Sequence, residues 1–387
     1  MSDQPNAPIY LDYAATTPID PRVAQKMADA MTVYGNYGNP ASRSHAYGWQ
    51  AEEAVEAARA ELARVLNADV REIVFTSGAT ESDNLAIKGP ALHPDNQRRH
   101  LITSAIEHKA VLDTCAFLET QGFEVTYLVP GAHGRVDVTQ VEEAIREDTL
   151  LVSIMQANNE LGTLNDVAAI GAVCRARGVL FHVDAAQSFG KVQIDVQRDC
   201  IDILSVSAHK IYGPKGIGFI YIRREPPIRM QPLIHGGGHE MGFRSGTLPT
   251  HQIIGLGQAA ALMHEHMFVE QARMSQLQQR FLRHIQQIPD SFVHSHPEHN
   301  LPSIQNVGFA GVDGETLVLA LPNLALSTGS ACNSASVEPS FVLSALGIPR
   351  DIAHASLRFS FGRFTSDEDV DLAGAQVAEV VGRLRGA

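Results

Sequence analysis

The sequence predicts an α/β fold: a mostly parallel sheet covered by helices in a large domain, accompanied by a smaller α+β domain. Short runs rich in apolar and β-branched residues alternate with helical patterns between residues 72 and 222. These runs are apolar on both faces, which is typical of parallel strands buried between two layers of helices. After about residue 256 the pattern changes to one long helical segment followed by further strand-like runs.

The expected strands of the large domain follow one another with helices between them. They cover Glu72–Thr76, His100–Thr103, Glu124–Leu128, Leu150–Met155, Val179–Asp184, Ile201–Ser207 and Gly218–Ile222. Helices are expected from about Ser82, from about Lys109 and over residues 166–177. This alternation favours parallel pairing, because parallel strands need a crossover connection.

The remaining elements indicate a second, smaller domain. Residues 257–287 have the composition of a long helix, residues 306–310 and 353–361 read as strands, and residues 366–385 read as a closing helix. We expect residues 9–13 to pack near the junction. The predicted division is therefore a large domain over residues 16–256 and a small domain formed by residues 1–15 and 257–387.

Composition excludes several classes of function. The formal net charge of −13 argues against direct contact with a nucleic-acid backbone or an anionic membrane. The start of the chain lacks the basic and apolar segments of a signal peptide. No apolar stretch approaches the roughly 20 residues of a membrane-spanning helix. We therefore expect a cytoplasmic protein.

Three of the four cysteines also indicate a cytoplasmic protein, whereas Cys332 has different neighbours in the sequence. Cys115 and Cys174 lie on apparent helix faces and Cys200 precedes a strand, so we expect structural roles in a reducing compartment. Cys332 differs, because seven of the nine residues from Ser327 to Ala335 are Ser, Thr, Gly or Ala. A thiol in such a run has no apolar neighbours to bury it, which favours a reactive or sulfur-carrying cysteine over an inert one.

Polar residues collect where the expected strands end, and ligands bind at that edge of an open parallel sheet. The turn Thr76–Ser82 is rich in Gly, Ser and Thr and leads into a helix. Its backbone N–H groups suit an anion such as phosphate, although an ordinary helix cap has the same composition. The Lys spacing of a P-loop is absent, so a nucleotide triphosphatase is not expected.

The next strand ends add an acid and a lysine. Taken singly, Asp184 suits a turn and Lys210 suits a solvated loop. Together with the turn after residue 76 they match the needs of a pyridoxal phosphate enzyme, namely a Schiff-base lysine, a carboxylate beside the pyridine nitrogen and a phosphate site. His108 could stack on such a ring. Asn159 and Gln187 could hydrogen-bond its hydroxyl group.

Five motifs carry a family resemblance. Asp184–Gln187, Ser207–Gly216, His235–Glu240, Arg244–Thr247 and Ser327–Cys332 resemble the IscS/NifS-type cysteine desulfurases, which belong to the class V aminotransferase-like group of fold-type I pyridoxal phosphate transferases. The similarity extends from about residue 9 to residue 385. The run around Cys332 resembles the longer, flexible form of the loop in that branch.

The resemblance implies a role for each matching residue. Lys210 would hold the cofactor as a Schiff base, Asp184 would pair with its ring nitrogen, and His108 would stack on its ring. Further cofactor contacts would come from Ala79, Thr80, Asn159, Gln187, Ser207, Ala208 and His209. Thr247 would reach the phosphate in a neighbouring subunit, which implies a homodimer with shared active sites. Asn39 and Arg358 would hold the substrate, and an Arg–carboxylate pair suits an amino acid.

The implied reaction converts L-cysteine to L-alanine. Lys210, displaced by the substrate, would remove the Cα proton, and the Cys332 thiolate would attack the substrate sulfur and keep it as a persulfide. Either an electropositive site or His108 acting as a base would have to generate that thiolate, because an unperturbed thiol is only a few per cent ionised near neutral pH. The resemblance further implies sulfur delivery to iron–sulfur cluster assembly and tRNA thiolation. The chain lacks the tail with which many relatives dock the iron–sulfur scaffold protein, so that contact stays open.

Other functions remain possible at this point. A class V aminotransferase would share the cofactor but have no use for Cys332, and a selenocysteine lyase would use the same residues. A non-enzymatic sulfur carrier would need Cys332 alone. His235 and His239 flank three glycines rather than sharing a helix face, so we expect no side-chain metal site.

Overall fold

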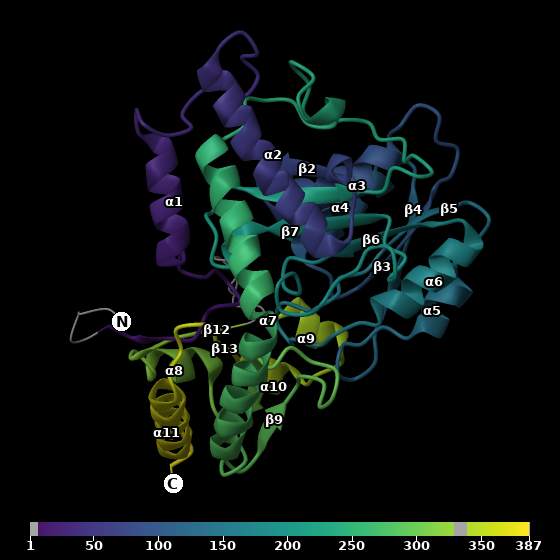
Figure 1. Cartoon of the computed structure of the whole chain (residues 1–387). Coiled ribbons are helices and arrows are strands. Elements are labelled where there is room, and N and C mark those ends of the chain that lie inside the picture. Colours follow the sequence, from purple (N-terminus) through teal and green to yellow (C-terminus); the bar gives the residue numbers. More distant parts are fainter. Residues whose placement is uncertain (1–6, 329–338, 387) are drawn as a thin grey trace.

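The computed structural model describes residues 7–328 and 339–386. Figure 1 shows a large sheet with its helices in the upper part of the molecule and a second group of elements below it. The long helix α7 (Thr250–Ile285) runs from the upper part into the lower one. Both the N-terminal segment and the C-terminal helix lie beside the lower group, so the two ends of the chain belong to the same region.

The large sheet has seven strands and mixed pairing. In spatial order they are β2 (Ile73–Thr76), β8 (Gly218–Ile222), β7 (Ile203–Ser207), β6 (Leu180–Asp184), β5 (Thr149–Ser153), β3 (His100–Ser104) and β4 (Glu124–Leu128). The pairs from β7 through β4 are parallel, whereas β8 is antiparallel to both β7 and β2. The predicted fold class, a mostly parallel sheet covered by helices, is confirmed.

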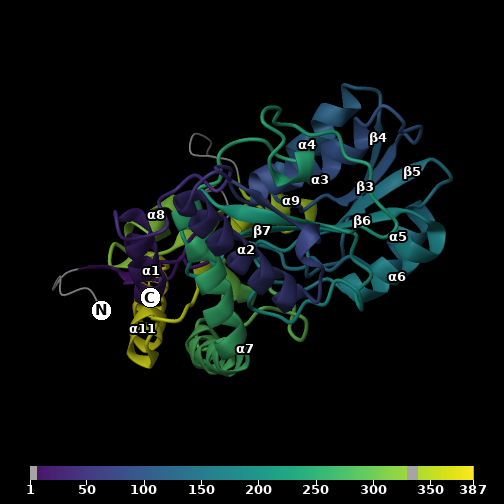
Figure 2. The ribbon, with the colours of Figure 1, turned by 45° about the horizontal axis from the view of Figure 1, so that its top comes forward.

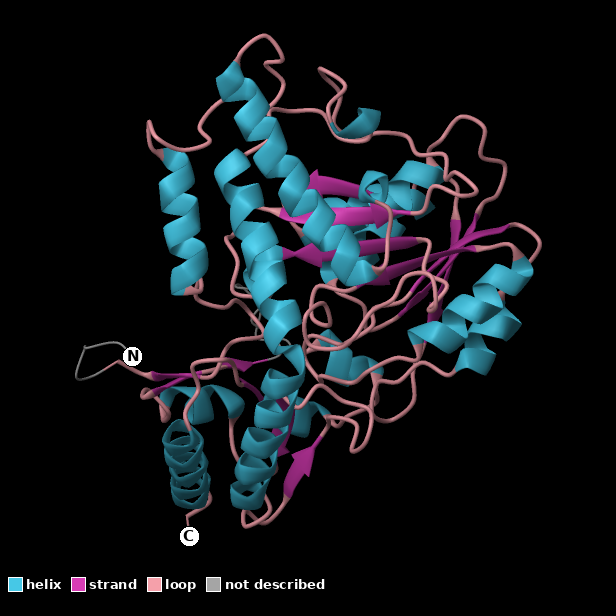
Figure 3. Ribbon diagram, viewed as in Figure 1, coloured by secondary structure: helices cyan, strands magenta, loops and turns pink. Residues whose placement is uncertain are grey.

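Helices cover both faces of this sheet, as Figure 3 shows. One face carries α2 (Ala46–Leu66), α5 (Val138–Ala144), α6 (Val167–Arg177) and the first part of α7, with α1 (Pro21–Met31) packed on α7. The other face carries α3 (Ala79–Ala91) and α4 (Lys109–Glu119). Figure 2 shows α2 and α7 side by side, in agreement with their many contacts.

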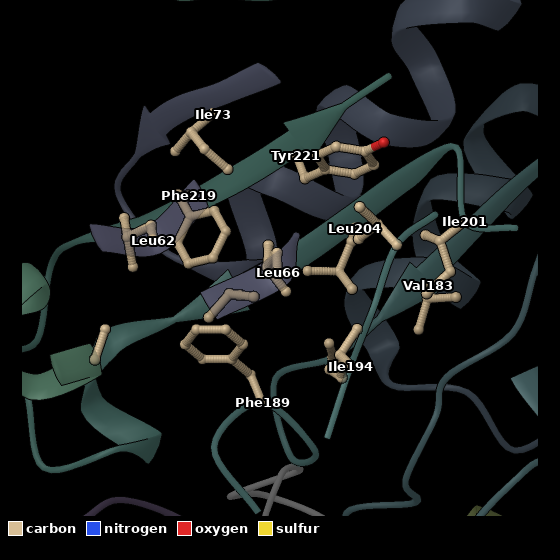
Figure 4. Packing of buried hydrophobic residues seen from close by; sticks show 14 of the residues in the cluster. Leu62, Leu66, Ile73, Val183, Phe189, Ile194, Ile201, Leu204, Phe219 and Tyr221 are labelled. Atoms are coloured by element: carbon tan, nitrogen blue, oxygen red, sulfur yellow. The ribbon is translucent and has the colours of Figure 1, made fainter. Parts of the chain in front are cut away.

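Alternate residues along each strand supply the two cores. Ile73 and Phe75 pack beneath α2, while Val74 between them packs against the α3 and α4 layer. Figure 4 shows the α2-side core, where Phe189 and Phe219 meet edge to face with their ring centroids 5.5 Å apart. Burial of each large apolar side chain stabilises the fold by about 1.5–3 kcal/mol.

The lower group is built on a four-stranded antiparallel sheet. Its order is β12 (Ser327–Thr328), β13 (Ser356–Ser360), β10 (Ile304–Phe309) and β9 (Ser291–Val293), and a two-stranded ribbon joins β1 (Ile9–Tyr10) to β11 (Leu324–Ala325). Its helices are α8 (Gly314–Leu319), α9 (Phe341–Ala345), α10 (Arg350–His354) and α11 (Asp367–Leu384). Three short 3₁₀ turns cover Val70–Glu72, Ala208–Lys210 and Glu240–Gly242.

Helix α7 belongs to both parts of the molecule. Met263 and Met267 pack in the core of the large sheet, whereas Leu277 and Phe281 pack with the lower sheet. The predicted boundary between residues 256 and 257 therefore lies within an uninterrupted helix. The division into domains at residues 15/16 and 256/257 stays a prediction.

Several local expectations need correction. The helix expected from about Ser82 begins at Ala79, and the helix expected over 257–287 begins at Thr250. The strand expected over 353–361 is β13 alone, because residues 350–354 form α10. The expected strand over 306–310 corresponds to β10, which begins two residues earlier. Helices α1, α2 and α5 were not among the sequence predictions.

Candidate active site

A cavity of about 610 Å³ opens at the carboxyl ends of β6 and β7, bounded on another side by the N-terminus of α3. Ten of the residues predicted for the site line it: Ala79, Thr80, His108, Asn159, Asp184, Gln187, Ser207, His209, Lys210 and Arg358. They come from both sheets and from four loops. The carboxyl edge of the parallel strands thus brings together residues that are up to 279 positions apart, from Ala79 to Arg358.

Lys210 lies in the 3₁₀ turn that follows β7. Its Nζ donates hydrogen bonds to the carbonyl oxygens of Ala14 (2.5 Å) and Ala15 (2.8 Å). These acceptors belong to the N-terminal segment, which forms one wall of the cavity. Two backbone carbonyls stabilise an ammonium group without adding a formal charge, so they orient the amine toward the cavity.

Asp184 is the last residue of β6 and is only 6% exposed. Its Oδ1 accepts a hydrogen bond from the Ala186 N–H at 2.8 Å. Burial raises the pKa of the Asp184 carboxyl, while the nearby His108 and Lys210 oppose that effect. A carboxyl group of raised basicity is well suited to share a proton with a nitrogen base in the cavity.

A second acid lies beneath Asp184. Asp83 on α3 is fully buried, and neither of its oxygens has a hydrogen-bond partner among the described residues. Burial, and then the neighbouring Asp184 carboxyl, raise the pKa of Asp83 well above its usual range. His182 Nε2 is 3.6 Å from Asp83 Oδ1, and burial lowers the pKa of His182 to about 3. Burial therefore opposes the charged form of both Asp83 and His182 beneath Asp184.

The N-terminus of α3 forms a polar cradle at the other end of the cavity. Gly78 caps the helix without a side chain, and its φ of 148° lies in a region that favours glycine. A Cβ added there would lie 3.5 Å from the Ser207 hydroxyl oxygen. The adjacent Ala79 and Thr80 also line the cavity. Helix dipole, backbone N–H groups and a hydroxyl together suit an anion.

The charges around this cradle are balanced. Arg244 forms an ion pair with Glu81, with Nε and Oε1 2.9 Å apart. Burial acts to raise the pKa of Glu81, but the hydrogen bonds from Arg244 and Ser77 outweigh it and the pKa is lowered. Burial and the nearby lysines lower the pKa of His209 to about 4, so its imidazole is neutral near pH 7. The ring Nδ1 of His209 lies 3.1 Å from the Thr16 hydroxyl oxygen.

His108 occupies the N-cap of α4. Its Nδ1 accepts a hydrogen bond from the Ala110 N–H at 3.1 Å. Because that nitrogen is the acceptor, the neutral ring carries its proton on Nε2. The cap therefore fixes both the tautomer and the position of a ring that borders the cavity.

Gln187 is held from both ends of its amide. Its Nε2 donates to the Ala14 carbonyl oxygen at 2.8 Å, and its Oε1 accepts from Lys191 Nζ at 3.1 Å. Burial, then the positive charges of Lys210 and Arg358, lower the pKa of Lys191 to about 7. Lys191 was not among the predicted site residues. Its position four residues after Gln187 could have indicated that the two side chains meet.

Arg358 enters the cavity from β13 and is 6% exposed. Its Nη1 donates to the carbonyl oxygen of Asn159 at 2.9 Å, and its Nη2 donates to Asp12 Oδ1 at 2.8 Å. Asp12 also lines the cavity. It was missed as a site residue, although the run of small and polar residues from Asp12 to Thr17, directly after a short strand, resembles a ligand-binding loop.

Four predicted residues are not in this cavity. Ala208 is fully buried behind it, and Asn39 and Thr247 are exposed elsewhere. The segments next to these last two line a separate hollow of about 420 Å³, which includes Pro40, Ala41, His239 and Leu248. Cys332 lies outside the described residues.

His239, in the glycine segment, makes a structural contact with the backbone. His239 Nδ1 accepts a hydrogen bond from the Gly246 N–H at 3.2 Å. Within residues 7–328 and 339–386, no group of three or more His, Cys, Asp or Glu side chains is placed to hold a metal ion.

Comparisons with known proteins identify one family. The sequence matches the class-V aminotransferase family over residues 9–372. It is 58% identical over 378 residues to the cysteine desulfurase IscS of Pseudomonas putida, covering 98% of this chain and 94% of that protein. Identity to the cysteine desulfurase IscS of Pseudomonas aeruginosa is also 58%, with the same coverage.

Solved structures give the same picture. A NifS-like protein superimposes with a TM-score of 0.90 at 35% identity, covering 97% of this chain and all of that one. The structure of SspA in complex with cysteine superimposes with a TM-score of 0.82 at 43% identity, covering 92% of this chain and 99% of that one.

Proposed function

We propose that this chain, which belongs to the class-V aminotransferase family and within it to the cysteine desulfurases, converts L-cysteine to L-alanine and passes the sulfur to Cys332 as a persulfide. The observation that carries the proposal is one cavity in which Lys210, Asp184 and the N-terminus of α3 come together. That combination is what a pyridoxal phosphate enzyme requires. Cys332 distinguishes a desulfurase from an aminotransferase.

The cofactor of this family is pyridoxal 5′-phosphate, and the cavity fits it. Its volume of about 610 Å³ lies within the usual range for cofactor sites. Lys210 would form the covalent bond, the buried Asp184 carboxyl would face the pyridine nitrogen, and the α3 N-terminus with Ser207 and His209 would hold the phosphate. When bound, the cofactor supplies an electron sink for a carbanion at the substrate Cα.

Further contacts would come from residues whose orientation is already fixed. Asn159 and Gln187 would meet the polar edge of the ring. His108 would stack on the ring face, with its Nε2–H available because Nδ1 accepts from Ala110. Ala208 would support the site from behind, where it is fully buried.

The proton transfers are assigned to Lys210. As a free amine it would take the proton from the substrate Cα and later return a proton to the alanine fragment. The carbonyl oxygens of Ala14 and Ala15, which accept hydrogen bonds from its Nζ, would hold the amine near the cavity and stabilise it when it is protonated.

The sulfur transfer is assigned to Cys332. Its thiolate would attack the substrate Sγ, so that an S–S bond forms while the Sγ–Cβ bond breaks. The electron pair of the broken bond stays with the alanine fragment, which takes up a proton at Cβ. The persulfide on Cys332 is then the transferable form of the sulfur. The solved relative SspA, 43% identical, holds cysteine in its structure, which supports this substrate.

Arg358 is the proposed carboxylate-binding residue. It is the buried guanidinium of the cavity wall and faces the same space as Lys210. Asn39 is the second proposed substrate contact. Because Asn39 lies outside the cavity of its own chain, that contact requires a second subunit or a movement of its segment.

A homodimer with shared sites is part of the proposal. Thr247 is exposed and away from its own cavity, as expected of a residue that serves a partner's phosphate. The segments beside Thr247 and Asn39 line one hollow. Large apolar side chains are exposed nearby in sequence: Met31, Val33, Tyr34, Tyr37, Tyr47 and Trp49. We call these six residues the aromatic patch, and exposed patches of this kind mark association surfaces.

Location and sulfur acceptors complete the proposal. Cys115, Cys174 and Cys200, the cysteines within the described residues, form no disulfide, which supports a reducing cytoplasmic location. No helix among the described residues is both long and apolar enough to span a membrane. Sulfur-acceptor proteins, including an iron–sulfur scaffold protein and a tRNA-thiolation relay, are the proposed partners.

Anaerobic turnover of L-cysteine with a reductant tests the function. Wild type should release alanine and sulfide without any keto acid, and Cys332→Ala should lose most sulfide release while retaining the bound-cofactor absorbance near ~420 nm. Lys210→Ala should lose that absorbance. Alanine and sulfide formation that is unaffected in Cys332→Ala would remove the proposed role of this thiol. A requirement for a keto acid would instead indicate an aminotransferase.

A further inference from the structure

The pair formed by Arg358 and Asp12 has a consequence for how the cavity binds carboxylates. Arg358 Nη2 donates to Asp12 Oδ1 at 2.8 Å, and the side chains are 8% and 24% exposed. Both residues border the cavity that contains Lys210. A carboxylate of the protein itself therefore occupies part of the guanidinium that we propose as the binding site for the substrate carboxylate.

The three nitrogen atoms of the Arg358 guanidinium differ in their hydrogen bonds. Nη1 donates to the Asn159 carbonyl oxygen at 2.9 Å. Nη2 donates to Asp12 through a single carboxylate oxygen. Nε is buried and has no hydrogen-bond partner among the described residues. Since Nε is buried, an incoming carboxylate would compete with Asp12 for the Nη2 group that Asp12 already occupies.

This arrangement suits a site that alternates between two carboxylates. A buried guanidinium without a counter-ion is unfavourable, so the empty site needs a negative partner. Asp12 supplies it through one hydrogen bond, which is weaker than a two-point Arg–carboxylate pair. When a substrate carboxylate arrives, two negative charges would lie on either side of one guanidinium, and their repulsion would oppose binding.

Asp12 is not needed to fix the N-terminal segment in place. The Ser360 N–H donates to the Leu11 carbonyl oxygen at 2.7 Å, and the Ala14 N–H donates to the Ser360 hydroxyl oxygen at 2.9 Å. Strand β1 is paired in register with β11. The backbone on both sides of Asp12 is thus attached to the lower sheet by bonds that do not involve its carboxylate.

We propose that Asp12 is a built-in carboxylate that neutralises Arg358 in the empty site and weakens the binding of amino-acid carboxylates there. Its effect would be greatest on the product, because L-alanine retains the carboxylate but no longer has the thiol of the substrate. Asp12 would then favour product release and limit trapping of other amino acids. This inference rests on the proposed role of Arg358.

The test compares holoenzymes of wild type, Asp12→Asn and Asp12→Glu. The inhibition constant of L-alanine against L-cysteine should fall roughly 3- to 10-fold in Asp12→Asn, as expected for the loss of one like charge at this separation. Asp12→Glu keeps the charge and should resemble wild type. L-Alaninamide, which has no carboxylate, should inhibit wild type and Asp12→Asn equally. If Asp12→Asn does not fold, Asp12→Ser replaces it in the same comparison.

A second readout does not depend on turnover. Acetate, used as a probe for a carboxylate site, should raise the midpoint of thermal unfolding more in Asp12→Asn than in wild type at equal concentration. Unchanged or weaker binding of L-alanine and acetate in Asp12→Asn would overturn the inference, because Asp12 would then only position Arg358.

Arg358→Gln separates this inference from the function on which it rests. If Arg358→Gln leaves L-alanine inhibition and the KM for L-cysteine unchanged, the proposed carboxylate site itself is wrong, and the inference fails with it. If Arg358→Gln weakens both while Asp12→Asn strengthens neither, only the inference about Asp12 fails. Weakening by Arg358→Gln together with strengthening by Asp12→Asn supports both.

Discussion

Burial controls the protonation of the side chains around the cavity. Glu160 follows β5, lines the cavity and is 2% exposed. Burial raises the pKa of its carboxyl to about 7, although the hydrogen bond that Ser340 Oγ donates at 2.5 Å acts in the other direction. Burial also lowers the pKa of Lys191, which donates to the cavity residue Gln187, to about 7. Acid and base are thus both brought to the pH at which the enzyme would work.

Glu160 should make the stability of the holoenzyme depend on pH. Its pKa is about 7 in the folded chain and 4.5 when unperturbed. Between these values the unfolded chain releases a proton that the folded chain retains, so stability falls as pH rises from about 4.5 to 7, by up to about 3 kcal/mol. Glu160→Gln keeps an acceptor for Ser340 but cannot ionise, so denaturant unfolding at pH 5, 6, 7 and 8 should show a smaller decline.

The matched control is Glu379→Gln on the exposed face of α11. It removes an acid of the same type from a solvated position and should reproduce the wild-type pH dependence. A pH dependence in Glu160→Gln equal to that of wild type would contradict the proposed shift.

Glycines in two helices have different roles. Gly255 and Gly257 of α7 allow close helix packing, and Gly78 precedes α3 at the proposed phosphate site. Gly257 lies inside α7, where an added Cβ would be 2.7 Å from the Ala58 Cβ of α2. Gly255 is similarly close to Met27 of α1. The predicted helix began at residue 257, where the sequence pattern changes, whereas α7 begins seven residues earlier at Thr250. Gly255 and Gly257 allow three helices to approach one another.

Gly78→Ala should weaken cofactor binding. The φ of 148° at Gly78 is strained for any residue with a Cβ, at a cost of about 1–3 kcal/mol, and the strain lies at the N-terminus of α3 where we place the phosphate. We expect a several-fold increase in the dissociation constant of pyridoxal phosphate, measured by absorbance after removal and re-addition of the cofactor.

Gly122→Ala provides the control for strain alone. Gly122 has a φ of 83°, and a Cβ there would meet nothing within 4 Å. This variant should lose stability but bind the cofactor as wild type does. Equal cofactor affinity in Gly78→Ala and wild type would show that α3 does not form the phosphate site.

Large apolar side chains remain exposed on the surface of the single chain. Tyr34 is 97% exposed and Val33 is 75% exposed, and both belong to the aromatic patch. The predicted site residues Asn39 and Thr247 lie outside their own cavity. Arg59 and Glu240 form a buried two-point ion pair, with both N–O distances 2.8 Å, which holds the segment before Thr247 against α2. That segment is therefore held in a fixed position against α2.

Tyr34→Asp should dissociate the proposed dimer. A charge at the centre of an apolar interface leaves an unpaired, desolvated carboxylate, which is unfavourable. Light scattering should show a shift from the mass of two chains toward that of one, and cofactor affinity should fall because the partner's Thr247 no longer reaches the phosphate.

Phe268→Asp on α7 is the matched control. Phe268 is 67% exposed but lies outside the aromatic patch, so its substitution should leave the mass unchanged. A Tyr34→Asp protein that retains the mass of two chains would place any dimer interface elsewhere.

Much of the fold could be predicted because its pattern is local. Most of the strands β2 to β8 are short apolar runs followed by polar residues, so their ends are visible in the sequence itself. Helices α1 and α2 were missed although a local signal was present. Helix α2 is rich in Ala, Glu and Arg, which favour helices, and it buries Val55, Leu62 and Leu66 along one face. Both helices pack against α7.

The residues at the strand ends could be read directly from the amino-acid sequence. His108, Asp184 and Lys210 each follow a recognisable strand or begin a helix, and parallel strands necessarily place such residues along one edge. The surroundings of these residues became visible only in the folded chain. Ala14 and Ala15 reach Lys210 from about 195 residues away, and Asp12 reaches Arg358 across 346 residues. No local pattern encodes such contacts, because they depend on how the N-terminal segment packs between the two sheets.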